Sequence, residues 1–388
     1  MKVFKKKKII DSQQYDDYWK LTVEYTDIYD MRFNNTLKII VLFIDQNHLD
    51  TVDICSNEFS EMYKKLQNEI DSYNPKSNKA SVRKSINQFI KLGFVKPFLK
   101  GYHKLCKRFL NVTDHYEKSS LFTKIFYENA SLSSSVKTDK TNIKEINFLL
   151  KTLAYKPDQI LTKNDIIALM VTPNISRISK GYLTKDELDR QYAYSKKIKF
   201  ENKKYNQITY LFKFLNYVPN IHASKDSGVS FINPNEVKID TKRDPILYGL
   251  LKKDLKAEST RIYGDTVCYL KKVHQKGLIC SHIKDSAVCL NEGKIDEAYD
   301  YYNTLFLAPD VDSYFDTYSI SFDDNGKMLI NSFERHDFDY VKSLSKYSLD
   351  KIILTPERLK YLQWHRSKFE EKLLRDKKFF GNKILGSN

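Results

Sequence analysis

The stretch ICSHIKDSAVCLNEGKIDEAYDYYNTLFLAPDVDSYFDTYSISF, residues 279–322, carries more chemical detail than any other part of the chain. His282 ends a short apolar run, and Asn303 stands just before a second apolar run at 305–307. Pro309 and the acidic residues after it are typical of a helix N-terminus, because proline fits the first helical turn and carboxylates accept hydrogen bonds from its unpaired N–H groups. The segment therefore predicts a strand, a loop, a second strand and a helix.

This order of elements, with its histidine, asparagine and helical carboxylate, resembles the HNH (ββα-metal) endonuclease family, and in particular the subgroup found in restriction enzymes. That subgroup has a pattern like S/A-H-I-K-P-W, then D-x-x-N-G-L-L-L, then D-x-L-F-D-x-G-x-I-S-F. The matching runs here are SHIK at 281–284, DYYNTLFL at 300–307, DSYFD at 312–316 and ISF at 320–322. The run YLQWHR at 361–366 is similar to the helix that follows the nuclease core, so the resemblance covers residues 276–370.

The resemblance implies hydrolysis of phosphodiester bonds in double-stranded DNA with Mg²⁺, or with Mn²⁺ as a substitute, leaving a 5′ phosphate and a 3′ hydroxyl. His282 would be the general base, since an imidazole with a pKa of about 6.5 can deprotonate water at neutral pH. Asp312 and Asn303 would give oxygen ligands to the metal, which neutralises charge developing on the phosphate. Asn303 has a second candidate role, to hold the loop so that His282 faces the water. Asp316 and Asp300 are further candidate metal carboxylates.

The metal shell departs from the family pattern, which leaves the complete ligand set open. Ser281 stands where many HNH enzymes have a metal-binding Asp or His, and Asp312 stands where the last ligand is often a histidine. Thr304 replaces a glycine, and residues 285–286 replace the Pro-Trp pair, so that Asp285 is one more candidate carboxylate. The cysteines at 268, 280 and 289 lack the spacing of the family's paired CxxC knuckles, and we expect no structural zinc.

A type II restriction enzyme is the favoured interpretation, because recognition and cleavage fall in separate regions and the sequence has no ATPase motor motif. It implies a cognate DNA methyltransferase in the same system. One HNH site cuts one strand per event, so double-strand cleavage would suggest a homodimer or sequential nicking. A modification-dependent or homing endonuclease is the alternative among enzymes. A non-catalytic DNA-binding protein with a degenerate HNH fold also stays open, since a single histidine beside a strand is more often a packing residue.

The charge of the chain agrees with a nucleic-acid partner. Lys and Arg number 65 against 49 Asp and Glu, a net charge of +16 with a pI near 9.2, as expected of a protein that neutralises phosphates. An AT-rich coding sequence would also favour lysine, so the charge is support only. The residues that we expect to contact DNA are Arg83, Lys84, Asn87, Gln88, Lys271, Lys272, Lys284 and Arg366.

Four of these residues lie in SVRKSINQFIKL, residues 81–92, where the apolar side chains have helical spacing. Gly93 is placed to end that helix, and Phe94–Val95 would follow as a short strand. The pattern predicts the second half of a winged-helix or helix-turn-helix unit with a polar face toward the major groove. An ordinary amphipathic helix with a solvated basic face is at least as consistent. For Arg366, bracing of the core is the alternative to a phosphate contact.

We expect an α+β protein of two or three domains: a mainly helical N-terminal region with winged-helix-like recognition over 1–130, a second mixed module and linker over 131–243, and the nuclease domain over 244–388. Helices are expected at 143–153, 163–170 and 244–275, and a strand at 208–212. The turn DDNG at 323–326 predicts a hairpin, and Thr355–Pro356 opens a further helix.

The sequence points to a cytoplasmic protein. No run of 18 or more apolar residues is present, and the lysines at 5–8 are followed by only two apolar residues, so neither a membrane span nor a signal peptide is expected. The chain has 5 cysteines, an odd number at scattered positions, which fits reduced thiols better than a disulfide framework.

Overall fold

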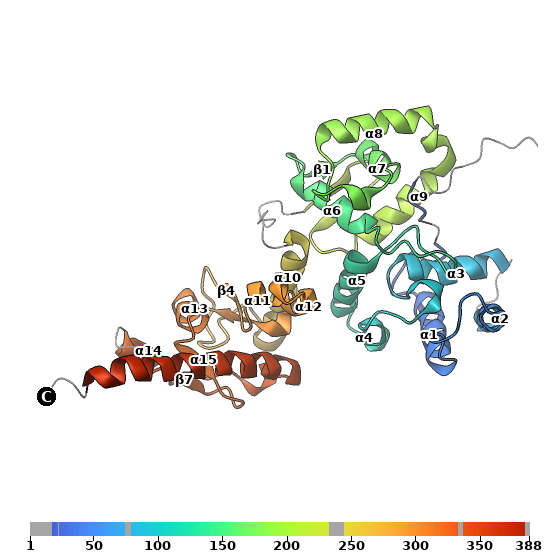
Figure 1. Ribbon diagram of the computed structural model, residues 1–388. Coiled ribbons are helices and arrows are strands. Elements are labelled where there is room, and N and C mark those ends of the chain that lie inside the picture. Colours follow the sequence, from blue (N-terminus) through green and yellow to red (C-terminus); the bar gives the residue numbers. More distant parts are fainter. Residues whose placement is uncertain (1–17, 22, 74–78, 233–243, 333–336, 385–388) are drawn as a thin grey trace, which may run out of the picture. The chain divides into compact units, whose positions relative to one another are not determined.

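The computed structural model describes residues 18–21, 23–73, 79–232, 244–332 and 337–384. As predicted, the chain is α+β, with many helices and small sheets of two or three strands. It divides into two compact units, residues 1–246 and 247–388 (Figure 1). The domain boundary that the sequence placed at residue 244 stays a prediction. A further division of the first unit at residue 130 stays a prediction.

The first part of unit 1 is helical. Its helices are α1 (Met31–Gln46), α2 (Asn57–Tyr73), α3 (Lys79–Lys91), η1 (Pro97–Leu99), α4 (Cys106–Asn111) and α5 (His115–Asn129). Helices α1, α2 and α3 pack on one another. Buried phenylalanines join them to the following segment: the ring centroids of Phe33 and Phe89 are 4.9 Å apart, and those of Phe94 and Phe109 are 4.8 Å apart, both in the edge-to-face geometry that aromatic pairs prefer.

Helix α3 is not followed by the strand that the sequence predicted. Gly93 ends the helix with a φ of +86°, and a Cβ there would lie 2.7 Å from the backbone carbon of Asn129, so only glycine fits this turn. Val95 forms a single isolated bridge with Tyr102 in place of a strand. The short strand expected at Phe94–Val95 is therefore wrong, and the recognition module expected around it stays a prediction.

The second part of unit 1 combines helices with the three-stranded sheet. Its elements are α6 (Glu145–Tyr155), β1 (Ile160–Leu161), α7 (Lys163–Met170), η2 (Ile175–Arg177), α8 (Lys185–Lys197), α9 (Phe200–Leu215), β2 (Ile221–Ser224) and β3 (Gly228–Phe231). All pairs are antiparallel, in the order β1-β3-β2. Helices α7 and α8 begin at capping boxes formed by Thr162 with Asp165 and by Thr184 with Glu187, in which each partner satisfies an unpaired N–H group of the other.

The helices predicted at 143–153 and 163–170 are confirmed as α6 and α7. The strand predicted at 208–212 is wrong, because this run lies inside α9. Ile208, Leu211 and Leu215 are buried at helical spacing, so burial of one helical face decides the conformation over the β-propensity of the side chains.

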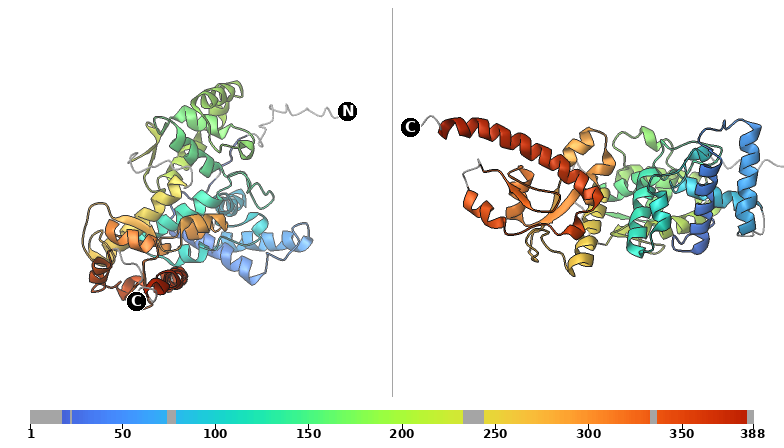
Figure 2. Two further views of the ribbon diagram at one scale, coloured as in Figure 1. Left: turned by 60° about the vertical axis from the view of Figure 1, so that its left-hand side comes forward. Right: turned by 90° about the horizontal axis from the view of Figure 1, so that it is seen from below.

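Unit 2 contains the predicted strand, loop, strand and helix. Its elements are α10 (Pro245–Tyr263, which starts at the boundary), β4 (Ile279–His282), α11 (Ser286–Asn291), α12 (Ile295–Ala298), η4 (Tyr301–Asn303), β5 (Thr304–Leu307), α13 (Pro309–Asp316), β6 (Ile320–Phe322), β7 (Met328–Ile330), α14 (Phe338–Leu344), η5 (Lys351–Ile353) and α15 (Pro356–Ile384). Strands β4 and β5 pair antiparallel, and α13 packs on β4. The long helix α15 runs along one side of the unit (Figure 2).

The hairpin predicted around 323–326 is confirmed as β6 and β7, and the helix predicted at Thr355–Pro356 is confirmed as α15. The helix expected over 244–275 ends earlier, at Tyr263, where Gly264 adopts a φ of +76°. The loop between β4 and β5 holds two short helices, α11 and α12, that the sequence analysis did not foresee.

A fully buried ion pair joins α10 to α15. The guanidinium of Arg358 binds the Glu258 carboxylate through two nitrogens, at 2.7 and 3.1 Å, and donates to the carbonyl of Ile353 at 2.7 Å. The hydroxyl of Tyr269 donates to the same carboxylate at 2.9 Å. Because removal of one partner would leave an unpaired buried charge, this pair ties the two helices firmly together.

His365 braces the other side of α15 as a neutral ring. Its ring lies 3.9 Å from that of Phe315, centroid to centroid, in a stacked arrangement. Nε2 is 3.0 Å from the carbonyl oxygen of Phe315, and Nδ1 is 2.9 Å from the hydroxyl of Ser321. A carbonyl only accepts, so Nε2 carries the proton and Nδ1 accepts from Ser321. Burial lowers the pKa of His365 to about 4.

Unit 2 is expected to lose stability as the pH falls from about 6.5 toward 4. Over this range His365 becomes protonated in the unfolded chain but stays neutral in the folded protein, which favours unfolding. One pKa unit corresponds to about 1.4 kcal/mol, so the loss reaches about 3 kcal/mol. Urea denaturation at several pH values measures it, with His365→Gln as the control. The variant should be less stable at pH 7 but should show a shallower decline. An equal decline in both proteins would contradict the assignment.

Candidate functional site

His282 is the last residue of β4, opposite Thr304 of β5. Its Nε2 lies 3.0 Å from the carbonyl oxygen of Ala298, at the end of α12. Because the carbonyl must accept, Nε2 carries a proton and donates it to this oxygen. The half-buried ring is thus oriented by the inserted loop. A fixed ring orientation of this kind is what a general base needs.

Asn303 is fully buried and ties the loop to the end of β4. Its Oδ1 accepts from the backbone N–H of Lys284 at 2.7 Å, and its Nδ2 donates to the carbonyls of Lys284 and Glu297, both at 2.9 Å. The side-chain oxygen, which would have to bind a cation, is already engaged by the Lys284 N–H. The geometry therefore fits the loop-holding role of Asn303 and does not fit a metal ligand.

The acidic candidates have different surroundings. Asp312 lies half-buried in the first turn of α13, and its carboxylate makes no hydrogen bond or ion pair with another described residue. Asp316 is exposed at the end of the same helix. Asp300 caps η4, accepting from the N–H of Tyr302 at 3.0 Å and from the hydroxyl of Tyr361 at 3.1 Å. This gives Asp300 a structural role in place of the expected metal role.

The remaining acidic candidate from the sequence, Asp285, accepts a hydrogen bond from the hydroxyl of Tyr318 at 2.8 Å. Over the described part of the chain, no three His, Cys, Asp or Glu side chains converge in a way that could hold a metal. Mg²⁺ does not require such a cluster, because it keeps several waters and is bound by one or two protein oxygens together with substrate phosphate.

Two oxygen groups meet that requirement. One is the Asp312 carboxylate. The other is the hydroxyl of Ser281, which is buried and has no hydrogen-bond partner among the described residues. Ser281 precedes His282 on β4, and α13, which carries Asp312, packs on that strand. These two residues therefore fit a hard cation better than Asn303 or Asp300.

The basic candidates of unit 2 all have partners. Lys284 is buried, with Nζ between the carboxylates of Glu292 and Glu297 at 2.9 and 2.7 Å, so it holds the inserted helices and does not face solvent. The other three are partly exposed but engaged. Lys271 pairs with Asp310, Lys272 with Asp350 at 2.9 Å, and Arg366 with Asp324 at 2.5 Å and the carbonyl of Phe322 at 3.0 Å.

The four candidates of α3 separate into two groups. Arg83 and Lys84 are exposed. Asn87 is half-buried, and its Oδ1 accepts from the N–H of Val136 at 2.9 Å. Gln88 is fully buried against the segment at 24–25, where it accepts two backbone N–H groups at 2.7 and 2.9 Å and donates to one carbonyl at 2.7 Å. Gln88 is therefore a structural side chain, contrary to the expectation of a base contact.

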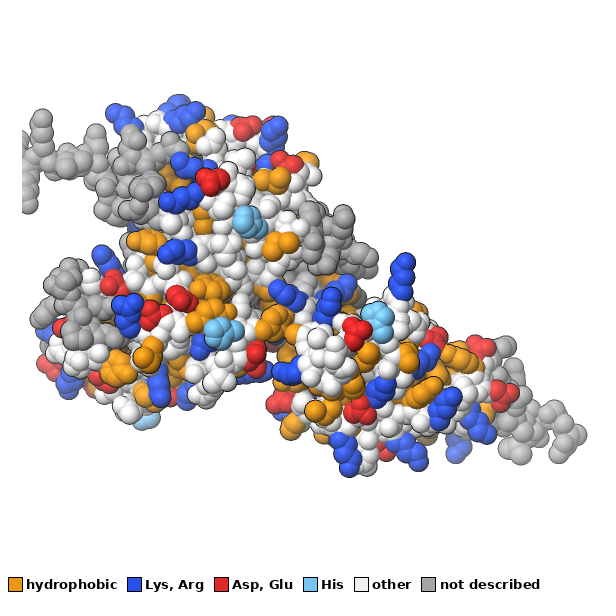
Figure 3. Space-filling view, turned by 180° about the vertical axis from the view of Figure 1, so that it is seen from behind, with side chains coloured by type: hydrophobic (Ala, Val, Ile, Leu, Met, Phe, Trp, Pro, Cys, Tyr) orange, Lys and Arg blue, Asp and Glu red, His pale blue; other side chains and the backbone are white. Residues whose placement is uncertain are grey.

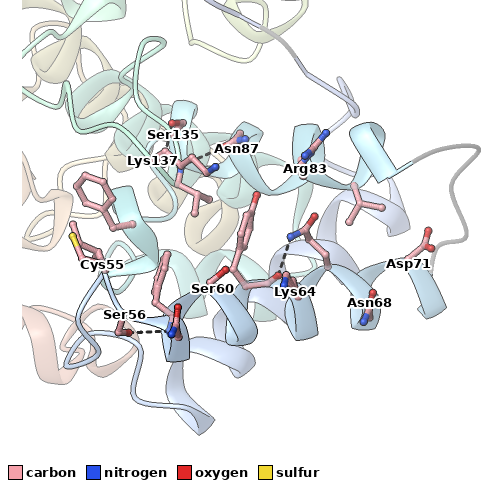
Figure 4. A pocket seen from close by; sticks show the side chains of 18 residues that line it. Cys55, Ser56, Ser60, Lys64, Asn68, Asp71, Arg83, Asn87, Ser135 and Lys137 are labelled. Atoms are coloured by element: carbon pink, nitrogen blue, oxygen red, sulfur yellow. Dashed lines mark hydrogen bonds between the residues drawn. The ribbon is translucent and has the colours of Figure 1, made fainter.

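Positive charge is spread widely. Figure 3 shows lysines and arginines over the face that it draws, interspersed with Asp and Glu. A more local feature, which the sequence analysis missed, is a pocket of about 980 Å³ in unit 1, lined mainly by α2 and α3 (Figure 4). Its walls come from segments far apart in the sequence, so no local motif marked it.

Comparison with known proteins does not assign the chain to a family. No protein-family model matches the chain, and no curated protein matches it. In the described residues, no helix is both long and apolar enough to cross a membrane. Function has to be argued from the geometry of the site.

Proposed function

We propose that the protein is a Mg²⁺-dependent DNA endonuclease of the HNH type, with its hydrolytic centre around His282. The observation that carries the proposal is the fixed histidine at the end of β4, held by the Ala298 carbonyl at 3.0 Å, in a strand-loop-strand-helix unit whose loop is clamped by Asn303. A catalytic side chain needs supporting hydrogen bonds that fix its position, and the bonds of Ala298 and Asn303 can supply them.

In this proposal the imidazole of His282 takes a proton from water as the water oxygen attacks phosphorus. The bond from phosphorus to the 3′ oxygen breaks, and that oxygen leaves with a proton from solvent as a 3′ hydroxyl, so the new end carries a 5′ phosphate. Asp312 and Ser281 are the residues that would hold the cation. When bound, Mg²⁺ would neutralise the negative charge that develops on the phosphate and the leaving oxygen.

DNA recognition is assigned to unit 1. The order α6, β1, α7, α8, α9, β2, β3, with a sheet ordered β1-β3-β2, is similar to a winged helix with one additional helix, and a helix followed by a hairpin suits groove binding. The net charge of +16 supports a phosphate-rich partner. A type II restriction enzyme acting on double-stranded DNA, with a cognate methyltransferase and a homodimer for double-strand cleavage, is the form of the proposal that we favour.

A DNA-binding protein without catalysis is the second candidate. It is favoured by one observation: Ser281 and Asp312 depart from the metal ligands of the HNH pattern.

Incubation of the purified protein with supercoiled plasmid separates the two candidates. We expect nicked or linear DNA with Mg²⁺ or Mn²⁺, none with EDTA, and 5′ phosphates at the ends. Both unmodified plasmid and plasmid with methylated bases are needed, because a modification-dependent enzyme would cut only the second. Retarded mobility of both DNAs in a gel, with no cleavage under any metal condition, would make the non-catalytic interpretation right.

A further inference from the structure

The pocket between α2 and α3 has no part in the site around His282. It has a volume of about 980 Å³, at the upper end of the range typical of small-molecule sites. In Figure 4, Arg83 and Asn87 of α3 lie across the pocket from Ser60, Lys64 and Asn68 of α2. The pocket therefore has room for a group the size of a nucleotide, enclosed by two helices.

The walls combine the three kinds of side chain that recognise a nucleotide. Aromatic rings are supplied by Phe59, Tyr63 and Phe98, amides by Gln67, Asn68 and Asn87, and cations by Lys64, Arg83 and Lys137. Aromatic rings stack on bases, amides bond to base edges, and cations bind phosphate. The one acid in the lining is Asp71, so positive charge prevails.

Several polar groups that line the pocket have no partner among the described residues. The side chains of Arg83, Lys64 and Asn68 make no hydrogen bond or ion pair with any of them. The Nδ2 of Asn87 also makes none, because only its Oδ1 is engaged, with Val136 at 2.9 Å. Burial raises the pKa of Tyr63, and the positive charge of the nearby Arg83 acts in the opposite direction.

The backbone beside the pocket is strained. Phe98 and Leu99 both have a φ of +58°, a conformation that is unusual for a residue with a Cβ and costs on the order of 1–3 kcal/mol. Leu99 is fully buried, whereas Phe98 is half-exposed and lines the pocket. The strained turn thus places one apolar side chain in the core and keeps a large aromatic ring at the pocket, which packing alone does not require.

We propose that this pocket binds a single nucleotide of the DNA substrate whose base is extruded from the duplex. The inference rests on the proposed function and deepens it, because it gives unit 1 a way to inspect one base for mismatch or modification. Extrusion is least costly for a mismatched base, so DNA with one mismatch is bound more tightly than fully paired DNA.

The test is a binding measurement in EDTA, which does not depend on cleavage. Fluorescence anisotropy of labelled duplexes compares a fully paired sequence with the same sequence carrying one mismatch. We expect a preference of about tenfold for the mismatch, lost in Arg83→Ala and in Phe98→Ala. Lys84→Ala is the matched control, since Lys84 is the neighbouring exposed cation of α3 but does not line the pocket, and it should keep the preference.

Equal binding of both duplexes, or equal loss of preference in Arg83→Ala and Lys84→Ala, would overturn the pocket assignment. Micromolar binding of a deoxynucleoside monophosphate alone would also overturn it in favour of a free nucleotide. Absence of binding to any DNA has a different meaning, because it removes the proposed function itself. Circular dichroism of the variants confirms that they are folded.

Discussion

Replacing His282 by alanine is expected to lower the rate of Mg²⁺-dependent DNA cleavage by about 10²–10⁴-fold, the contribution of a positioned general acid or base, while DNA binding stays unchanged. The ring is half-buried and makes a hydrogen bond through Nε2 to the carbonyl of Ala298, so its removal is expected to cost little stability. The measurement is the initial rate of plasmid nicking by equal amounts of wild-type and variant protein.

His274 provides the control for a histidine of unit 2 without a catalytic role. It is exposed, and its Nδ1 lies 3.0 Å from both the carbonyl of Thr266 and the carboxylate of Asp265. His274→Ala should nick plasmid at the wild-type rate. If His282→Ala binds DNA normally and still cleaves at that rate, another group is the base.

The helices and turns that the sequence predicted correctly are those stabilised by interactions between residues a few positions apart. The start of α13 follows from Pro309, and the turn between β6 and β7 follows from the carboxylate of Asp323, which accepts from the N–H groups of Asn325 and Lys327 at 2.9 and 2.8 Å. These are local hydrogen bonds and local backbone preferences, which the order of residues alone determines.

The roles of single side chains were harder to predict, because their partners lie elsewhere in the chain. The pattern around Gln88 marks it as a polar position on a helix, yet the segment at 24–25 packs there and uses its amide. Lys284 looks like a basic residue beside a motif, but the helices folded into the loop bring Glu292 and Glu297 to it. Neither environment can be deduced from helical or strand periodicity.

The same limit applies to the candidate metal ligands. Asn303 and Asp312 both match positions of the HNH pattern, and their spacing in the sequence does not distinguish their roles. Only the three-dimensional contacts separate a buried amide that binds two backbone carbonyls and one N–H group from a carboxylate with no bond among the described residues. This difference gives the most direct test of the site.

Asn303→Asp is expected to destabilise unit 2 by about 3–5 kcal/mol and to abolish cleavage. The change keeps the oxygen that accepts from the Lys284 N–H, but it replaces the NH₂ donor by an oxygen that would face the carbonyls of Lys284 and Glu297. Two hydrogen bonds are lost and a carboxylate is buried without a cation to pair with it. Urea denaturation followed by circular dichroism measures the free energy of unfolding.

A metal ligand would respond in the opposite way, because a carboxylate binds Mg²⁺ at least as well as an amide oxygen does. In that case Asn303→Asp would keep its stability and would cleave at the same or lower Mg²⁺ concentration, which is the result that would contradict the loop-holding role. Asp300→Asn is the matched control. Its amide oxygen can still accept from the Tyr302 N–H, so we expect a loss of less than about 1 kcal/mol and cleavage near the wild-type rate. Loss of cleavage in Asp300→Asn at unchanged stability would indicate that Asp300 is a metal ligand after all.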